Sequence, residues 1–253
     1  MRELNSYLML FFSAIRAFMA RSGWMFLLGG GSLAASRVSQ TVSFFLPLKI
    51  FIVISSHKVP SYFDFLPNAL TYDEKIVILA CAVPFTYLAY IAFGVMHRWF
   101  TDRHLRVFSG KSIELRGKDV PQKNIARLHN HSAKALAECL FFVMSMVIAI
   151  VLNPIVALTI FILVYLNLML FYHTALKAED SERLTFLGLH RRQFIEYVSS
   201  SNFMIVFAVL VLDTMFIGTS IYSTIFLLLL CRMVFQALNR FSNENIHILR
   251  LTR

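Results

Sequence analysis

The feature that most constrains this chain is the stretch from Cys139 to Tyr172, which contains no Asp, Glu, Lys or Arg. As a single helix it would extend roughly 50 Å, whereas the hydrocarbon core of a bilayer is about 30 Å thick. Asn153-Pro154 lies near its middle, and proline removes a backbone donor and disfavours helical geometry in the residue before it. The stretch therefore predicts a membrane hairpin, with one helix ending at Leu152 and the next starting at Ile155. A single kinked helix is the alternative.

Composition supports a membrane protein for the rest of the chain. The sequence is 58% hydrophobic and 15% charged, whereas soluble domains are about 45–50% apolar and about 25% charged. Its net charge of +10 would also fit a nucleic-acid partner. The charged residues, however, fall between long apolar runs. We therefore predict contact with membrane lipids and no nucleic acid. Cys81, Cys139 and Cys231 lie in apolar segments, which indicates small buried hydrophobes rather than disulfides.

The apolar runs predict an all-α polytopic membrane protein with six transmembrane helices. The expected spans are Trp24–Ile54, Ile76–Phe100, the two arms of the hairpin, Asn202–Ile217 and Ile221–Leu238. The expected connections are the loop Ser55–Lys75, the polar regions His97–Glu138 and His173–Ser200, and a tight turn at Gly218-Thr219-Ser220. Residues 1–21 contain the apolar run Leu4–Ala20, which is short for a span, and we expect an interfacial helix on the cytoplasmic surface. Residues 22–253 form the six-helix domain.

Positive charge predicts the orientation of these spans. Of the 24 Lys and Arg residues, only Lys58 and Lys75 fall in the expected outer loops, and Arg37, Lys49 and Arg232 fall inside spans. All the others lie in segments that share one side of the membrane. By the positive-inside rule, both termini are expected in the cytoplasm, and the bacterial cytoplasmic membrane is the expected location.

Small and polar residues mark one face of the first span. Gly29-Gly30-Gly31 and the serines and alanines that follow would allow another helix to approach closely, or would mark a kink. Arg37, Gln40 and Thr41 follow at helical spacing. A span this polar is not expected to face lipid on all sides.

Ionisable residues inside spans are costly unless they are paired or hydrated. Lys49 and Asp213 lie at matching depths near the outer ends of their spans and could pair across the bundle. Arg37 and Arg232 lie deeper toward the cytoplasm, where Glu138 and Glu196 could be their partners. Two interpretations remain open: the pairs fix helix register, or they line a polar translocation path.

No catalytic, cofactor-binding or metal-binding constellation stands out. Ser109-Gly110-Lys111-Ser112 contains the end of a phosphate loop, but Leu105 stands where the pattern requires glycine and no strand precedes it. His97, His104, His129 and His131 are close in sequence, but no Cys or carboxylate completes a metal set, and a solvated basic loop is the preferred interpretation. The chain therefore has no recognisable ATPase of its own.

The helix pattern resembles the transmembrane domain of ABC exporters of the six-helix, domain-swapped type. That family has an interfacial elbow helix, a long first helix, short outer turns and long cytoplasmic loops, and this chain has each in order. The closing stretch GTSIYSTIFLLLLCRMVFQALNRFSNE is similar to the sixth helix of that family. The nucleotide-binding domain that follows the sixth helix in the family is missing, and the region His173–Ser200 is shorter than the usual coupling loop.

The resemblance implies a permease subunit that moves a lipid-linked or amphipathic substrate, as a homodimer or with a similar chain. ATP hydrolysis would then come from a separate subunit docked at the cytoplasmic tips. The residues expected there are Arg106, Lys111, Arg116, Arg183, Arg191 and Arg192. The alternative is a motorless scaffold or accessory subunit with the same fold in envelope assembly. A membrane-embedded enzyme acting on lipid is a third class, which no catalytic group supports.

Overall fold

The computed structural model describes residues 2–56, 71–108, 113–115, 118–174, 188–218 and 220–252. These residues are almost entirely helical. The elements are α1 (Arg2–Ser22), α2 (Trp24–Ser56), α3 (Tyr72–Phe108), β1 (Ile113–Leu115), β2 (Lys118–Val120), α4 (Gln122–Leu152), α5 (Pro154–His173), α6 (Arg191–Phe216) and α7 (Ile221–Thr252). The two short strands pair antiparallel, with Ile113 opposite Val120 and Leu115 opposite Lys118.

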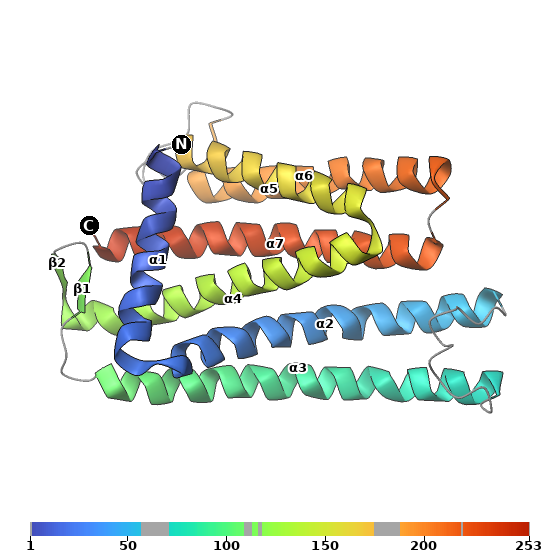
Figure 1. The fold of residues 1–253 in the computed structure, drawn as a ribbon, viewed down its shortest axis with the longest axis horizontal. Helices are drawn as coiled ribbons and strands as arrows, with labels where there is room; N and C mark the ends of the chain where they lie inside the picture. Colours follow the sequence, from blue (N-terminus) through green and yellow to red (C-terminus); the bar gives the residue numbers. More distant parts are fainter. Residues whose placement is uncertain are drawn as a thin grey trace.

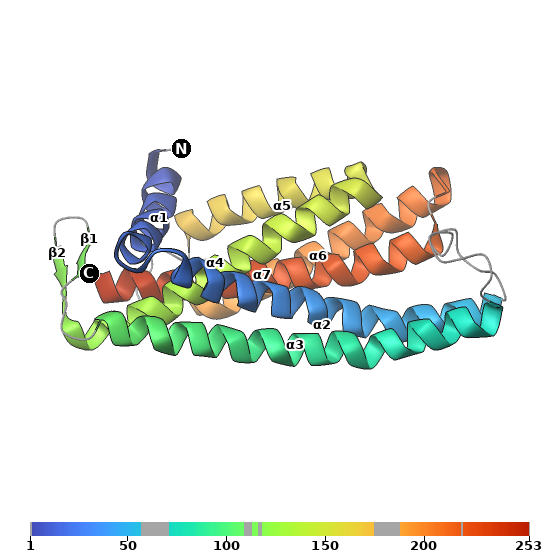
Figure 2. The same ribbon diagram turned by 60° about the horizontal axis from the view of Figure 1, so that its bottom comes forward.

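The six helices from α2 to α7 form an elongated bundle (Figure 1). Helices α2 and α3 pack side by side, α4 packs against both α2 and α7, and α5 and α6 cover the opposite side of the bundle. Figures 1 and 2 show α1 running across one end of the bundle rather than along it, beside the β1–β2 hairpin and the C-terminal end of α7. In the described part of the chain, these six helices are long and apolar enough to cross a membrane. The chain is thus an all-α polytopic integral membrane protein.

The turn between α4 and α5 confirms the predicted hairpin. Helix α4 ends at Leu152 and α5 starts at Pro154, the position in a helix where a missing backbone N–H costs least. Asn153 caps α5, because its Oδ1 accepts hydrogen bonds from the backbone N–H groups of Ile155 at 3.0 Å and Val156 at 3.1 Å. Cap and proline are both local features, which explains why the sequence predicts this turn well.

Several helices continue beyond the apolar runs that predict them. The region His97–Glu138, expected to connect two spans, is mostly helical, because α3 continues to Phe108 and α4 starts at Gln122. Helix α6 likewise starts at Arg191, well before the expected Asn202, and α7 continues to Thr252. Hydropathy marks where a chain leaves the hydrocarbon, whereas a helix continues for as long as packing supports it.

Packing of α1 provides that support at one end of the bundle. Four buried side chains of α1 recur at helical spacing: Phe11, Ala14, Ile15 and Phe18. They form one core cluster with residues of α2, α4, α7 and the strands β1 and β2. A second and larger cluster joins α4, α5, α6 and α7 around Phe141, Ile160 and Leu227. The described structure therefore has a core under α1 and another along the spans.

The glycine run of α2 has one position where close approach is essential. A Cβ atom added to Gly30 would lie 2.7 Å from Cδ2 and 2.9 Å from Cγ of Leu136 in α4, which is closer than carbon atoms pack. A Cβ on the next residue, Gly31, would meet nothing within 4 Å. The glycine run is predicted to allow another helix to approach closely, and at Gly30 that helix is α4.

Candidate functional site

A buried carboxylate connects three helices near the middle of the bundle. Glu138 of α4 is 1% exposed, and its Oε1 lies 2.5 Å from Nη1 of Arg37 in α2. The same oxygen accepts a hydrogen bond from Nε of Arg240 in α7 at 2.9 Å. A buried charge is tolerated when it is paired, so each of these three side chains depends on the others. The predicted pairing of Arg37 with Glu138 is confirmed, and Arg240 is an additional partner.

The two arginines also line a polar cleft of about 780 Å³ between α2, α3, α4 and α7. Its volume is within the range of small-molecule sites in proteins. Four cations and one carboxylate are among its side chains, and an apolar part comes from α2 and α3. The lining consists of Leu33, Ser36, Arg37, Gln40, Tyr90, Ile91, Gly94, Val95, His97, Arg98, Thr101, Asp102, Asn130, Lys134 and Arg240.

The cleft opens between α3 and α4. Arg98 and Asp102 of α3 and Asn130 and Lys134 of α4 line the cleft and are exposed, so they form its rim. The floor is less exposed and is built from α2 and α7. Within the described residues, neither Arg98 nor Lys134 has an ion-pair partner, and both residues belong to the lining of the cleft.

Two polar contacts fix α2 against α3 beside this cleft. Ser36 Oγ donates a hydrogen bond to the backbone oxygen of Tyr90 at 2.9 Å. His97 Nδ1 lies 2.8 Å from the backbone oxygen of Gly29, and because a carbonyl only accepts, this ring nitrogen carries the hydrogen. The imidazole Nε2 of His97 remains as the second polar atom of the ring. The wall formed by α2 and α3 is therefore held in register by side-chain hydrogen bonds as well as by packing.

The polar face expected on α2 is divided between the cleft and the helix itself. Arg37 and Gln40 line the cleft. Thr41 is 3% exposed, and its hydroxyl donates to the backbone oxygen of Arg37 at 2.9 Å within the same helix. Arg37 and Thr41 thus obtain their polar partners inside one chain.

The outer residues Lys49 and Asp213 each have defined surroundings. Lys49 Nζ lies 5.3 Å from the ring centroid of Phe45, and its side chain lines a mainly apolar cavity of about 390 Å³. Asp213 is 5% exposed, and its Oδ2 accepts a hydrogen bond from Nδ2 of Asn153 at 2.7 Å. Asn153 therefore links the α4–α5 turn to α6 while it caps α5. A direct pair between Lys49 and Asp213 stays a prediction.

Arg232 is exposed on α7 and lines a separate polar pocket of about 190 Å³ between α6 and α7. Of the residues predicted to dock a partner, Arg106 lies exposed near the end of α3, and Arg192 lies exposed near the start of α6. Arg191 is only 7% exposed. Lys111, Arg116 and Arg183 lie outside the described residues. Docking at this end stays a prediction.

Histidines in the region between the second and third spans are not in a solvated loop, contrary to expectation. His104 of α3 and His129 of α4 are buried, and their rings stack with centroids 4.6 Å apart. The rings of Phe18 and Phe26 pack around them. The helices extend past the apolar runs and α1 covers them, which explains the burial. Among the described residues, no group of three His, Cys, Asp or Glu side chains could hold a metal ion.

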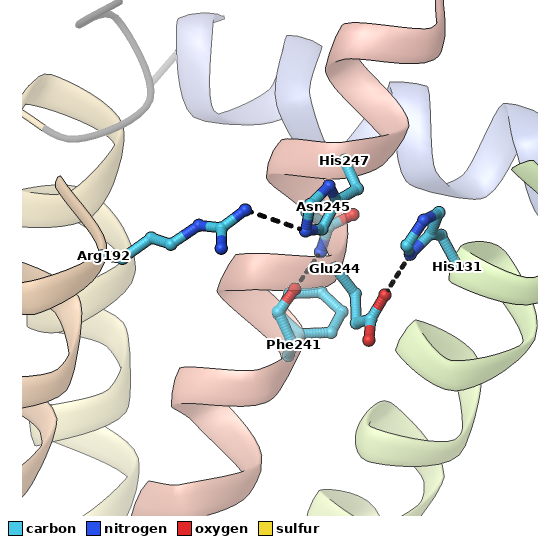
Figure 3. Close-up of polar contacts among 6 residues, drawn as sticks. All are labelled: His131, Arg192, Phe241, Glu244, Asn245 and His247. Carbon is cyan, nitrogen blue, oxygen red and sulfur yellow. Dashed lines mark hydrogen bonds and ion pairs between the residues drawn. The ribbon is translucent and has the colours of Figure 1, made fainter. Parts of the chain in front are cut away.

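A polar network ties α4, α6 and α7 together near the cleft (Figure 3). His131 Nδ1 donates to Oε2 of Glu244 at 2.5 Å, and the rings of His131 and His247 stack 4.6 Å apart. Arg192 Nη2 donates to Nε2 of His247 at 3.2 Å. Asn245 on the same helix donates back to the Phe241 backbone oxygen at 3.0 Å. These contacts position the ends of α4 and α7 that carry the cations of the cleft.

Sequence reasoning missed most cations of the cleft. It ended the last expected span at Leu238, before Arg240, and it left Arg98 and Lys134 in the polar region His97–Glu138. A signal was present, because Lys134 and Glu138 lie four residues apart, as do Arg98 and Asp102. Opposite charges at this spacing share one face of a helix. The pattern indicated that the helices continue past the apolar runs.

Comparisons of the chain with protein-family models, with curated proteins and with solved structures find no match.

Proposed function

We propose that this chain is the transmembrane permease subunit of an ABC-exporter-like system, moving a lipid-linked or amphipathic substrate with a separate ATPase subunit. The observation that supports this proposal best is the basic cleft between α2, α3, α4 and α7. Its mouth carries cations and polar groups, and part of its wall is apolar. A site of this kind suits a substrate with a polar head and an apolar tail.

The bacterial cytoplasmic membrane, with both termini in the cytoplasm, is the proposed location. The distribution of Lys and Arg supports it, because the end of the bundle that holds α1 and the C-terminal end of α7 carries most of the cations among the described residues. Reporter fusions after Asn153 and after Gly218 should report the outside. A cytoplasmic signal at either position would contradict the proposed orientation.

Helix α1 is proposed as an interfacial elbow helix. It runs across the end of the bundle, and Met9 and Phe12 are exposed on the side away from its packed residues. Exposed apolar side chains beside Arg16 suit a helix lying at the headgroup level. Residues 1–21 then anchor the six-helix domain of residues 22–253 at the cytoplasmic surface.

A dimer, of two copies or with a similar chain, is part of the proposal. Closed two-fold symmetry is the commonest way to complete a shared pathway. The most apolar stretch of α3 has none of its residues buried within the described chain, so it offers a surface for either lipid or a second copy. Arg37 pairs with Glu138 of the same chain, so α2 does not need a second subunit to neutralise that residue. Mass measurement in nanodiscs tests this part directly.

The central test is transport in proteoliposomes. We would purify the chain from native membranes with any bound ATPase, reconstitute the complex, and follow a fluorescent short-chain phospholipid between leaflets by quenching from outside. ATP-dependent movement that is lost in the variant Arg98→Gln/Lys134→Gln, which changes two exposed cations of the cleft, supports the permease. The variant Lys123→Gln, which changes an exposed cation of α4 outside the cleft, is the control and should leave movement unchanged. Absence of ATP-dependent movement from the intact complex would contradict the proposal.

The second candidate is a motorless scaffold or accessory subunit in envelope assembly. It is favoured by the Arg37–Glu138–Arg240 cluster, because charges that pair with one another in one chain serve to hold helices as well as to line a path. The two functions differ in their need for ATP. A chain that purifies without an ATPase, and whose absence disturbs envelope assembly without any change in lipid movement, is a scaffold.

A further inference from the structure

We infer that the basic cleft binds a phosphate-bearing anionic headgroup, and that an amphiphile in the bilayer carries this headgroup. The inference rests on the proposed function in that it names the chemical class of the substrate. Binding can nevertheless be measured without transport.

Charge in the cleft selects an anion. Arg98 and Lys134 stand at the mouth without ion-pair partners among the described residues, while Asp102 is the single carboxylate of the lining. Arg37 and Arg240 share the buried carboxylate Glu138. Four cations therefore face two carboxylates, and an anionic group would compensate the excess.

Unused donors point in the same direction. Arg37 Nε and Arg240 Nη2 are buried and have no hydrogen-bond partner among the described residues. Both arginines belong to the lining of the cleft. Guanidinium groups favour oxygen anions such as phosphate, because they present several donors in one plane. A phosphate in the cleft could accept hydrogen bonds from these atoms while the Glu138 contacts remain intact.

The position of the mouth indicates a lipid headgroup rather than a group deep in the hydrocarbon. Lys134 lies just before the uncharged stretch that begins at Cys139. Arg98 precedes Trp99, which is 53% exposed and has the Arg103 guanidinium 5.2 Å from its ring centroid. Exposed tryptophan is typical of the membrane interface. Basic pockets between helices at this level are typical binding sites for anionic lipid headgroups.

The rest of the lining explains why the ligand is an amphiphile. Ile91 and Val95 line the cleft, and both are also exposed on α3, with Val95 62% exposed. The apolar wall therefore continues out of the cleft onto the surface of α3, beside Leu88 at 63%. An acyl or isoprenoid chain could lie along this surface while its headgroup remains among the cations. A free phosphate would leave this apolar wall uncovered.

Native mass spectrometry of the full-length protein tests the inference. Phosphatidic acid and phosphatidylcholine with identical acyl chains would be titrated separately, and apparent affinities for the first bound lipid compared. The double variant Arg98→Gln/Lys134→Gln removes two cations from the mouth. The matched control, Arg103→Gln/Lys123→Gln, removes two exposed cations from the same two helices outside the cleft. All four side chains are exposed on their helices, so the thermal unfolding midpoints of both variants should equal that of the wild type.

We expect preferential binding of phosphatidic acid, weakened at least about tenfold in the mouth variant and by less than about twofold in the control. Equal weakening in both variants would overturn the inference, because it would show general attraction to a positive surface. Equal binding of the two lipids by the wild type would also overturn it. Inorganic phosphate provides the remaining arm. If it displaces the lipid at similar concentrations, the apolar wall contributes nothing, and the amphiphile is the wrong class.

Results for this inference and for the proposed function can be separated. Selective lipid binding without ATP-dependent movement would contradict the permease and leave the headgroup site standing. ATP-dependent movement of an amphiphile without phosphate, together with no lipid selectivity in the cleft, would support the permease and contradict the headgroup site.

Discussion

The carboxylate of Glu138 provides the sharpest test of how this bundle is held together. Replacing it with leucine keeps a side chain of similar size but leaves the guanidinium groups of Arg37 and Arg240 without their shared acceptor. Arg37 is the more affected, since its side chain is only 16% exposed, whereas Arg240 at 39% can turn toward water. The variant Glu138→Gln removes the charge and retains an acceptor, so it separates the two effects.

The expected magnitude follows from the two contacts. A hydrogen bond to a charged group contributes about 1.5–3 kcal/mol, and removing one member of a buried pair costs about 3–5 kcal/mol. Because Arg240 regains hydration, we expect Glu138→Leu to lower the free energy of unfolding by about 3 kcal/mol. Glu138→Gln should lower it by about half as much. The double variant Arg37→Met/Glu138→Leu should recover at least half of the loss, because no unpaired buried charge then remains on α2 or α4.

Unfolding by dodecyl sulfate in mixed micelles, followed by circular dichroism, measures these free energies. Arg232→Gln on α7 is the control, and this exposed residue should change stability by less than about 0.5 kcal/mol. A value for Glu138→Leu within about 1 kcal/mol of the wild type would refute the reasoning. Strict additivity of the Arg37 and Glu138 changes would refute it as well, because contacting residues must show a coupling energy.

Three further predictions concern helix contacts and the outer half of the bundle. Gly30→Ala should destabilise by about 1–3 kcal/mol through overpacking. Its neighbour Gly31→Ala should be neutral or should stabilise by up to about 1 kcal/mol, because alanine is the better helix former and its Cβ meets nothing within 4 Å. Equal effects in the same unfolding assay would disprove the close approach. Asn153→Ala should lower the free energy of unfolding more than Asn153→Ser does. Both variants lose the contact with Asp213, but serine still caps α5, and the cap alone contributes about 1 kcal/mol. Lys49→Met and Asp213→Leu should each destabilise more than the double variant if the two charges pair, and additive effects in a double-mutant cycle would argue against the pair.

Local chemistry explains the part of the fold that the sequence predicts correctly. The Asn153-Pro154 turn depends on a proline and a capping side chain that act within a few residues, and both are visible in the sequence. The six spans depend on the length of each apolar run relative to the bilayer, which is also a property of each segment alone. The pairing of Arg37 with Glu138 could be inferred because equal depth in a membrane limits the choice of partners.

Tertiary packing decided what lies at the ends of the spans. Hydropathy places Arg98, Lys134 and Arg240 outside the hydrocarbon, but it does not tell whether the chain there is loop or helix. The core formed with α1, β1 and β2 supports the helices beyond their apolar runs. These cations therefore converge on one cleft, and His104 becomes buried. Such convergence depends on which faces of separate helices meet, and that is set by contacts between residues far apart in the chain. The sequence alone therefore determined the spans and their turn, whereas the cleft exists only because α2, α3, α4 and α7 pack at one particular rotation.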